Sequence, residues 1–207
     1  MLKAMEALAR LRQGNRRFVL DQTTTPRFSN ATRRAQLLEG QEPFAIILGC
    51  SDSRVPAELV FDQGFGDLFV IRVAGNIVAP SQVGSVEFAA SRFGTRLVVV
   101  MGHTQCGAII ATLDDLRGHA RPESRNLRSI IDRVRPSLEP LLTSGQPANE
   151  DAFFHQAIRA NVRASADHLR HGSELLEELV NKDGLLVVAA EYSLETGEVD
   201  FFDGLPL

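Results

Sequence analysis

Two short segments of the sequence carry side chains that could hold a metal ion. Residues 50–54 read Cys-Ser-Asp-Ser-Arg, and residues 102–107 read Gly-His-Thr-Gln-Cys-Gly. Thiolate, imidazole and carboxylate groups are ligands that zinc accepts, and four of them complete its tetrahedral shell. The chain has only two cysteines, and each segment contains one of them. The sequence therefore predicts one zinc ion per chain, with the following ligand set: Cys50, Asp52, His103 and Cys106.

Each cysteine taken alone has a simpler interpretation. A cysteine at the end of a strand is usually a small core residue, and the spacing of His103 and Cys106 also occurs in many proteins that bind no zinc. Here both cysteines lie beside polar turns flanked by glycine. The combination of the two segments favours a metal site over an ordinary core position.

Asp52 can take either of two roles at such a site. If its carboxylate binds the metal, the site is closed, as in structural or resting zinc sites. If Arg54 holds the carboxylate instead, one ligand position opens for water, as in catalytic zinc sites. Such a water loses a proton near neutral pH and becomes a nucleophile. Without a metal, the two residues would form an ion pair that only orders the loop.

The expected strands would bring the two segments to one edge of a sheet. Apolar runs typical of strands covered on both faces occupy residues 44–49, 68–73, 97–101 and 185–190, and only the second is broken, by Arg72. Residues 199–202 follow a turn as an antiparallel edge strand, and helical patterns cover residues 83–93 and 108–116. The expected fold is α/β, a mostly parallel sheet flanked by helices. Ligands collect at the carboxyl ends of such strands, which Cys50 and His103 directly follow.

Further helices are expected on both sides of this core. An apolar stripe predicts a first helix that ends at Gly14, and its members are Leu2, Met5, Leu8 and Leu11. A polar connector over residues 21–30 leads to a second helix over residues 31–38. These parts define an N-terminal helical arm, residues 1–40, ahead of a zinc-binding α/β domain, residues 41–207.

The C-terminal half reads as three helices and their connections. Helical patterns cover residues 126–135, 149–170 and 174–181, and Ser173 is placed to cap the last of them. Prolines are expected to separate the first two of these helices, and they stand at positions 136, 140 and 147.

Composition narrows the kind of protein. The 207 residues carry a formal net charge of -4 with both signs spread along the chain, so we expect no nucleic-acid partner. The chain has no run of about 18 apolar residues, and we expect no membrane span. Its N-terminus lacks the apolar core of a signal peptide, and two cysteines make a poor disulfide framework. We expect a reducing, cytoplasmic setting.

At these residues the chain resembles the β-class carbonic anhydrases. The resemblance rests on residues 50–54, on Arg-Val-Ala-Gly-Asn at residues 72–76 and on residues 102–107, and it extends over essentially the whole chain. It implies zinc bound by Cys50, His103 and Cys106, with Asp52 as fourth ligand or as partner of Arg54. It also implies reversible hydration of carbon dioxide to bicarbonate and a proton, with residues 41–207 as the catalytic domain.

The resemblance also implies how substrate is bound and how the chain assembles. Carbon dioxide is small and apolar and needs a narrow apolar pocket, for which Phe69, Val73 and Ala74 are candidates. Phe69 has a plainer interpretation as strand core. Gln41 matches a family position whose side chain reaches the substrate, often across a subunit interface. Proteins of this family are dimers or dimers of dimers, so a homodimer or homotetramer is expected.

Three other functions compete with this one. Hydrolysis of carbonyl sulfide or carbon disulfide would use the same fold and metal on another substrate. A zinc-stabilised interaction or nucleic-acid module would unfold without metal and turn over nothing, but two strand-end segments are not a zinc-finger pattern, and a basic patch is missing. A redox protein would join Cys50 and Cys106 in a disulfide, although the sequence has no Cys-x-x-Cys motif.

Overall fold

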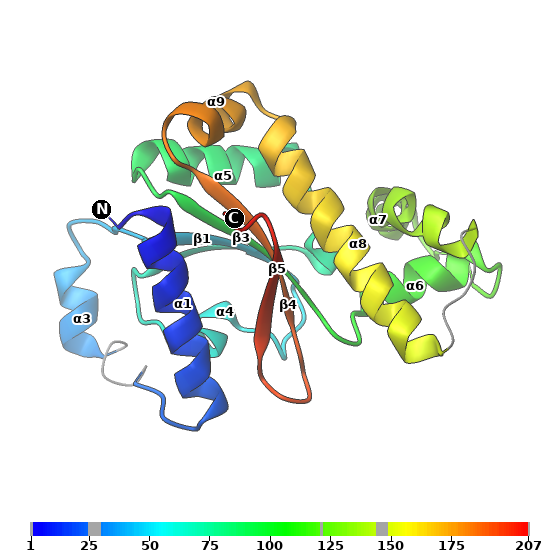
Figure 1. Ribbon diagram of the computed structural model, residues 1–207, viewed down its shortest axis with the longest axis horizontal. Coiled ribbons are helices and arrows are strands. Elements are labelled where there is room, and N and C mark those ends of the chain that lie inside the picture. Colours follow the sequence, from blue (N-terminus) through cyan, green and yellow to red (C-terminus); the bar gives the residue numbers. More distant parts are fainter. Residues whose placement is uncertain (1, 25–29, 121, 144–148, 207) are drawn as a thin grey trace.

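The computed structural model describes residues 2–24, 30–120, 122–143 and 149–206, and its centre is a five-stranded sheet (Figure 1). The strands are β1 (Ala45–Gly49), β2 (Leu68–Arg72), β3 (Leu97–His103), β4 (Leu186–Tyr192) and β5 (Val199–Asp203). Their order is β2-β1-β3-β4-β5, and only β5 runs antiparallel to its neighbour. This confirms the expected α/β fold with a mostly parallel sheet and an antiparallel edge strand.

The central strands are buried because both of their faces are covered. Every residue of β1 and of β3 is buried, and successive side chains of a strand point to opposite faces. Ile46 and Leu48 thus join one apolar cluster, whereas Ala45 and Ile47 join a second cluster on the other face. A continuous apolar run is what this three-layer arrangement requires of its inner strands.

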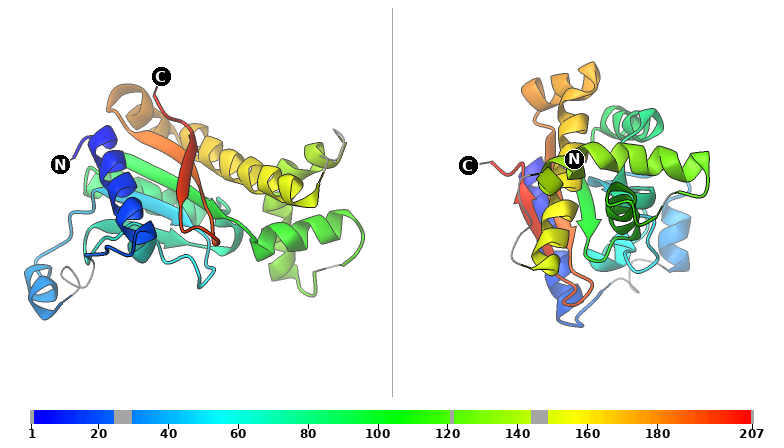
Figure 2. Two further views of the ribbon diagram at one scale, coloured as in Figure 1. Left: turned by 60° about the horizontal axis from the view of Figure 1, so that its bottom comes forward. Right: turned by 90° about the vertical axis from the view of Figure 1, so that its right-hand side faces the viewer.

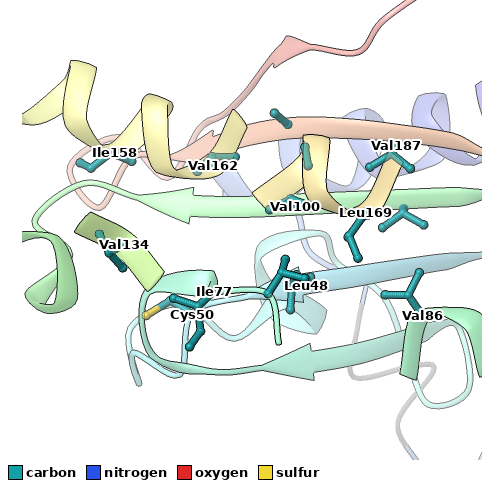
Figure 3. Close-up of a cluster of buried hydrophobic side chains, with 14 of the residues drawn as sticks. Leu48, Cys50, Ile77, Val86, Val100, Val134, Ile158, Val162, Leu169 and Val187 are labelled. Atoms are coloured by element: carbon teal, nitrogen blue, oxygen red, sulfur yellow. The ribbon is translucent and has the colours of Figure 1, made fainter. Parts of the chain in front are cut away.

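Helices of different parts of the chain cover the two faces (Figures 1 and 2). The first cluster contains side chains from α5 (Pro80–Arg92), α6 (Gly107–Leu116), α7 (Arg125–Thr143), α8 (Glu150–His171) and α9 (Glu174–Lys182). The second contains side chains from α1 (Ala4–Val19) and α4 (Ala57–Val60). Figure 3 shows the first cluster, to which Cys50 belongs together with Ile77 and Val134. The cluster therefore reaches the carboxyl end of β1.

The first helix does not end at Gly14 as predicted. Helix α1 continues to Val19, and Gly14 lies buried inside it. A Cβ atom added at Gly14 would stand 1.8 Å from the carbonyl oxygen of Phe61. The glycine is therefore needed for close approach of the helix to the backbone after α4, and not for helix termination.

The helix predicted over residues 126–135 is present, but the prediction that it ends before the prolines is wrong. Helix α7 runs from Arg125 through Pro136 and Pro140 to Thr143. Ile131, Val134 and Leu138 are buried, whereas both prolines are exposed. The prolines thus lie on the solvent side, where water can satisfy the carbonyls that lose an intrahelical hydrogen bond. Pro147 lies outside the described residues.

Strand β3 and two short elements differ from the sequence prediction. Strand β3 is two residues longer than expected and includes Gly102 and His103, so His103 ends the strand and does not follow it. The short helix α4 and the 3-10 turn η1 (Ala74–Asn76) were not predicted. The structure confirms the helices predicted over residues 83–93, 108–116, 149–170 and 174–181. It also confirms the predicted cap, since the Ser173 hydroxyl accepts a hydrogen bond from Leu176 N–H at 3.2 Å.

The two N-terminal helices are placed differently. Leu8 and Leu11 of α1 are fully buried against the sheet, whereas none of the residues of α3 (Ala31–Gln36), all of them described, is buried. Division of the chain at residue 40 stays a prediction, and residues 25–29 of the connector lie outside the described residues. In the part of the chain that the structure describes, each helix is too short or too polar to cross a membrane.

Candidate metal centre

Three side chains from two neighbouring strands and one helix meet at the carboxyl edge of the sheet. Cys50 directly follows β1, His103 is the last residue of β3, and Cys106 precedes the first residue of α6. All three are buried, and their ligand atoms lie within 4.8 Å of one another. Among the described residues this is the only group of three or more such side chains close enough to hold one ion. The structure thus brings together three of the four predicted ligands.

A tight turn after β3 returns the chain toward the strand it has just left. Gln105 has a positive φ of 56°, which is uncommon for a residue with a side chain. At Gly102, an added Cβ atom would lie 2.5 Å from Val162 Cγ2 of α8. The turn allows Cys106 to face the same space as His103, and the glycine lets α8 pack directly on the strand that carries the imidazole.

The imidazole of His103 is oriented as a metal ligand would be. Its Nδ1 atom lies 2.8 Å from the carbonyl oxygen of Thr104, which can only accept, so the proton resides on Nδ1. The Nε2 atom then carries no proton and has a free lone pair. It is buried without a hydrogen-bond partner among the described residues. A buried unpaired nitrogen is costly, and a metal ion facing the two thiols would satisfy it.

The two thiols also favour a cation between them. The hydrogen bond from Cys106 lowers the pKa of Cys50 to about 4. The same contact raises the pKa of Cys106, because loss of its proton would leave two thiolates side by side. A divalent cation removes this repulsion and holds both thiolates. The donor set of two sulfurs and one nitrogen therefore fits zinc.

Asp52 lies beside this cluster but is held by Arg54. The Arg54 side chain donates from Nε to Asp52 Oδ1 at 2.9 Å and from Nη2 to Oδ2 at 2.7 Å. The backbone N–H of Arg54 also donates to Oδ1 at 2.9 Å. These contacts hold the pKa of Asp52 well below its usual range. Asp52 Oδ2 lies 3.8 Å from His103 Nε2, so the carboxylate faces the site in the Arg54-paired arrangement.

Arg72 fixes the loop that carries Cys50 and Asp52. Its Nε donates to the carbonyl oxygen of Cys50 at 3.0 Å, and its Nη2 donates to that of Asp52 at 2.5 Å. Sequence reasoning assigned Arg72 no role of its own. An arginine that interrupts an otherwise apolar strand is the signal that could have identified it.

The segment that follows β2 also contacts the cluster. The backbone amides of Asp52 and Gly75 both contribute to lowering the pKa of the Cys50 thiol. An added Cβ atom at Gly75 would stand 2.9 Å from the Cβ of Ala108. Gly75 is therefore confined between the thiol and helix α6, a role that sequence reasoning did not identify.

The residues predicted to bind substrate come from separate parts of the chain. Val73 and Ala74 are half-buried and directly precede Gly75. Phe69 lies in a group of aromatic rings, with centroids 6.3 Å from Phe88 and 6.1 Å from Phe93. Gln41 is exposed before β1. Substrate binding by these four residues stays a prediction.

Comparison with known proteins identifies the family. Residues 45–199 match the family model described as "Carbonic anhydrase". The chain is 45% identical over 190 residues to a carbonic anhydrase of Mycolicibacterium smegmatis, covering 92% of this chain and 89% of that protein. It is 36% identical over 187 residues to carbonic anhydrase 2 of Mycobacterium tuberculosis, covering 90% and 87%.

Solved structures agree with the sequence comparison in fold. A tetrameric β-carbonic anhydrase of Sordaria macrospora superposes with a TM-score of 0.75 at 22% identity, covering 84% of this chain and 87% of that one. A β-carbonic anhydrase of Aspergillus fumigatus gives 0.75 at 24% identity, covering 98% and 92%. The chain therefore belongs to the β-carbonic anhydrase family. It is accordingly an enzyme of the carbonate dehydratase class, a lyase.

Proposed function

We propose that this protein catalyses the zinc-dependent, reversible hydration of carbon dioxide to bicarbonate and a proton. The observation that carries this proposal is the buried group of Cys50, His103 and Cys106, whose ligand atoms lie within 4.8 Å of one another. The unpaired Nε2 of His103 supports it. One zinc ion per chain would bind to these three side chains.

The residues around the ligands have separate tasks in this reaction. Bound zinc would lower the pKa of a water molecule and so supply a hydroxide nucleophile near neutral pH. The Asp52 carboxylate, kept ionised by Arg54, would accept a hydrogen bond from the attacking hydroxyl group and orient it toward carbon dioxide. Arg54 would also keep Asp52 from becoming a fourth metal ligand, since it occupies both carboxylate oxygens.

We further propose that the substrate pocket and the assembly follow the family pattern. Val73 and Ala74 would line the apolar side of the pocket, with Phe69 and Gln41 as further candidates. A homodimer or homotetramer is supported by the tetrameric relative of Sordaria macrospora. Leu2 and Met5 are 36% and 48% exposed and are available for a subunit contact. Light scattering would measure the assembly, and a monomer would contradict it.

The test is stopped-flow measurement of carbon dioxide hydration at pH about 6.5 to 9, a range around the expected ionisation of metal-activated water, with zinc measured on the same sample. We expect about one zinc per chain and fast turnover. The variant Cys106→Ser should lose both. Full zinc content without turnover would contradict the proposal.

Two alternative functions have less support. Nothing in the comparisons favours carbonyl sulfide or carbon disulfide as substrate, and turnover of these compounds in the same assay would reveal such a preference. Both cysteines, which lie in the described part of the chain, are free thiols and not a disulfide. A reducing, cytoplasmic setting stays a prediction.

A further inference from the structure

Two side chains of helix α8 hold the segment that touches Cys50. Asn161 Nδ2 donates to the carbonyl oxygen of Gly75 at 2.8 Å, and Ser165 Oγ donates to that of Asn76 at 3.0 Å. The two donors are four residues apart and lie on the same face of α8. Asn161 is 2% exposed and Ser165 is 6% exposed, so water does not compete freely for these hydrogen bonds.

The segment that they hold has a left-handed backbone conformation at two successive residues. Gly75 and Asn76 both have positive φ, at 68° and 44°. For a residue with a side chain this conformation is uncommon, although asparagine adopts it more often than most, and the surrounding groups fix it here. Asn76 N–H donates to Val73 O at 3.0 Å, and the two donors of α8 add hydrogen bonds to the carbonyl oxygens of Gly75 and Asn76.

The conformation matters because η1 packs against the elements around the ligands: a Cβ atom added at Gly75 would stand 2.9 Å from Ala108 Cβ of α6 and 3.5 Å from Val134 Cγ2 of α7. The Gly75 backbone amide also contributes to the lowered pKa of Cys50. A hydrogen bond to a thiolate withdraws charge from sulfur and fixes its direction, and partners of this kind tune both the affinity and the electronics of a metal site. If the turn relaxed, the Gly75 amide would turn away from the sulfur. The orientation of a metal ligand therefore depends on a helix that contributes no ligand.

We propose that Asn161 is a positioning residue of the metal centre, which acts by holding η1 so that the Gly75 amide stays on the Cys50 sulfur. Ser165 acts in the same way on Asn76. The inference rests on the proposed function, because it requires that Cys50 bind zinc.

The test compares Asn161→Leu with a matched variant, Asn15→Leu. Asn15 is also buried, and it also donates to backbone carbonyls, those of Val60 at 3.1 Å and Gly197 at 2.8 Å. It lies on α1, the helix whose apolar side chains join the cluster on the other face of the sheet. Zinc affinity would be measured by competition with a chromogenic chelator, and the cobalt-substituted proteins would be compared by absorption spectroscopy.

We expect Asn161→Leu to weaken zinc binding by about tenfold, the lower end of the effect of losing such a partner. Its thiolate-to-cobalt absorption band should move to longer wavelength, because a sulfur without the hydrogen bond gives up charge more easily. Asn15→Leu should lower the unfolding temperature and leave zinc affinity and the band unchanged. Equal zinc affinity and equal spectra for Asn161→Leu and the wild type would overturn the inference, whatever the loss of stability.

If Asn161→Leu does not fold, a second pair of variants tests the positioning role of α8. Ser165→Ala removes only a hydroxyl group, and it should shift the cobalt band in the same direction by a smaller amount. Ser165→Thr keeps the hydroxyl and should restore the wild-type band. If the wild type itself binds neither zinc nor cobalt, the proposed function and this inference both fail. If it binds them and the Ser165 variants have no effect, only the inference fails.

Discussion

At the scale of single residues, the pairing of Asp52 with Arg54 determines which of two roles the Asp52 carboxylate takes. A carboxylate held by Arg54 can assist the reaction, whereas a free one could bind the metal. Arg54 occupies both carboxylate oxygens, while Asp52 Oδ2 lies only 3.8 Å from His103 Nε2. The carboxylate is close enough to act on a nucleophile at the site but is held by another partner. The proposed reaction therefore depends on the negative charge of the Asp52 carboxylate more than on the shape of the side chain.

The variant Asp52→Asn tests this use of charge. It keeps the size of the side chain but removes the anionic acceptor, so we expect carbon dioxide hydration to fall by about a hundredfold or more. Zinc content should remain near that of the wild type. Asp167→Asn is the matched control, because Asp167 accepts from Arg170 Nη1 at 2.7 Å in a comparable pair on α8. Equal activity of Asp52→Asn and Asp167→Asn would show that the carboxylate has no part in the reaction.

The low pKa of Asp52 also predicts how stability depends on pH. Arg54 holds this pKa below the unfolded value, which is about 3.9. The pair therefore stabilises the fold above that value, and its contribution is lost as the pH falls toward the folded pKa. Arg54→Gln should be less stable than the wild type at pH 6, and the difference should narrow below about pH 4.

This comparison is made by thermal unfolding of both proteins with the metal removed, so that loss of zinc in acid does not contribute. Asp167→Asn provides the baseline for a surface pair. A stability difference between wild type and Arg54→Gln that stays constant from pH 3 to 7 would contradict the pairing.

At the scale of elements, close approach accounts for the glycines that the structure uses most tightly. Helix α1 lies against the backbone of Phe61 at Gly14, where an added Cβ atom would stand 1.8 Å from the carbonyl oxygen. Asn15, the next residue, donates to Val60 O at 3.1 Å. The helix is thus fixed to the end of α4 by one small residue and one polar residue.

Gly14→Ala should therefore destabilise the protein by about 3 kcal/mol, in the range of severe overpacking. Gly84→Ala is the matched control, since Gly84 is an exposed glycine inside α5 where an added Cβ atom meets no described atom within 4 Å. There the change should stabilise the helix by about 0.5–1 kcal/mol. Urea unfolding measures both. A Gly14→Ala protein as stable as the wild type would show that α1 can move away from α4 without cost.

The elements also show which features a sequence can predict. The buried strands were predictable because short continuous apolar runs such as Ala45–Gly49 are typical of strands covered on both faces. The metal-binding cluster was predictable because its ligand types are rare in this chain. The continuation of helix α7 beyond residue 135 was not, because the exposure of Pro136 and Pro140 depends on which face the helix buries. Asn161 and Ser165 were not, because their acceptors lie 86 and 89 residues away along the chain.

At the scale of the whole molecule, the candidate metal centre joins parts of the chain that lie far apart in the sequence. Cys50 follows β1, His103 ends β3 and Cys106 precedes α6, while η1 and α8 support the site from one side. On the other face, Asn15 of α1 donates to Gly197 O at 2.8 Å, which joins the first helix to the last hairpin. A metal ion would add a further connection between distant segments, at the carboxyl edge of the sheet.

The last prediction is that zinc stabilises the entire fold. A ligand that binds only the folded state adds about 4 kcal/mol when its free concentration is a thousand times its dissociation constant. For a chain of this size, 1 kcal/mol corresponds to about 2–4 °C, so the unfolding temperature should rise by about 10 °C between chelated and zinc-buffered protein. Cys106→Ser should lack this shift, because it removes one of three ligands. If Cys106→Ser shows the full shift, zinc binds elsewhere and the ligand set is wrong. A wild-type protein without a shift would show that the two thiols and the imidazole do not act together on the metal.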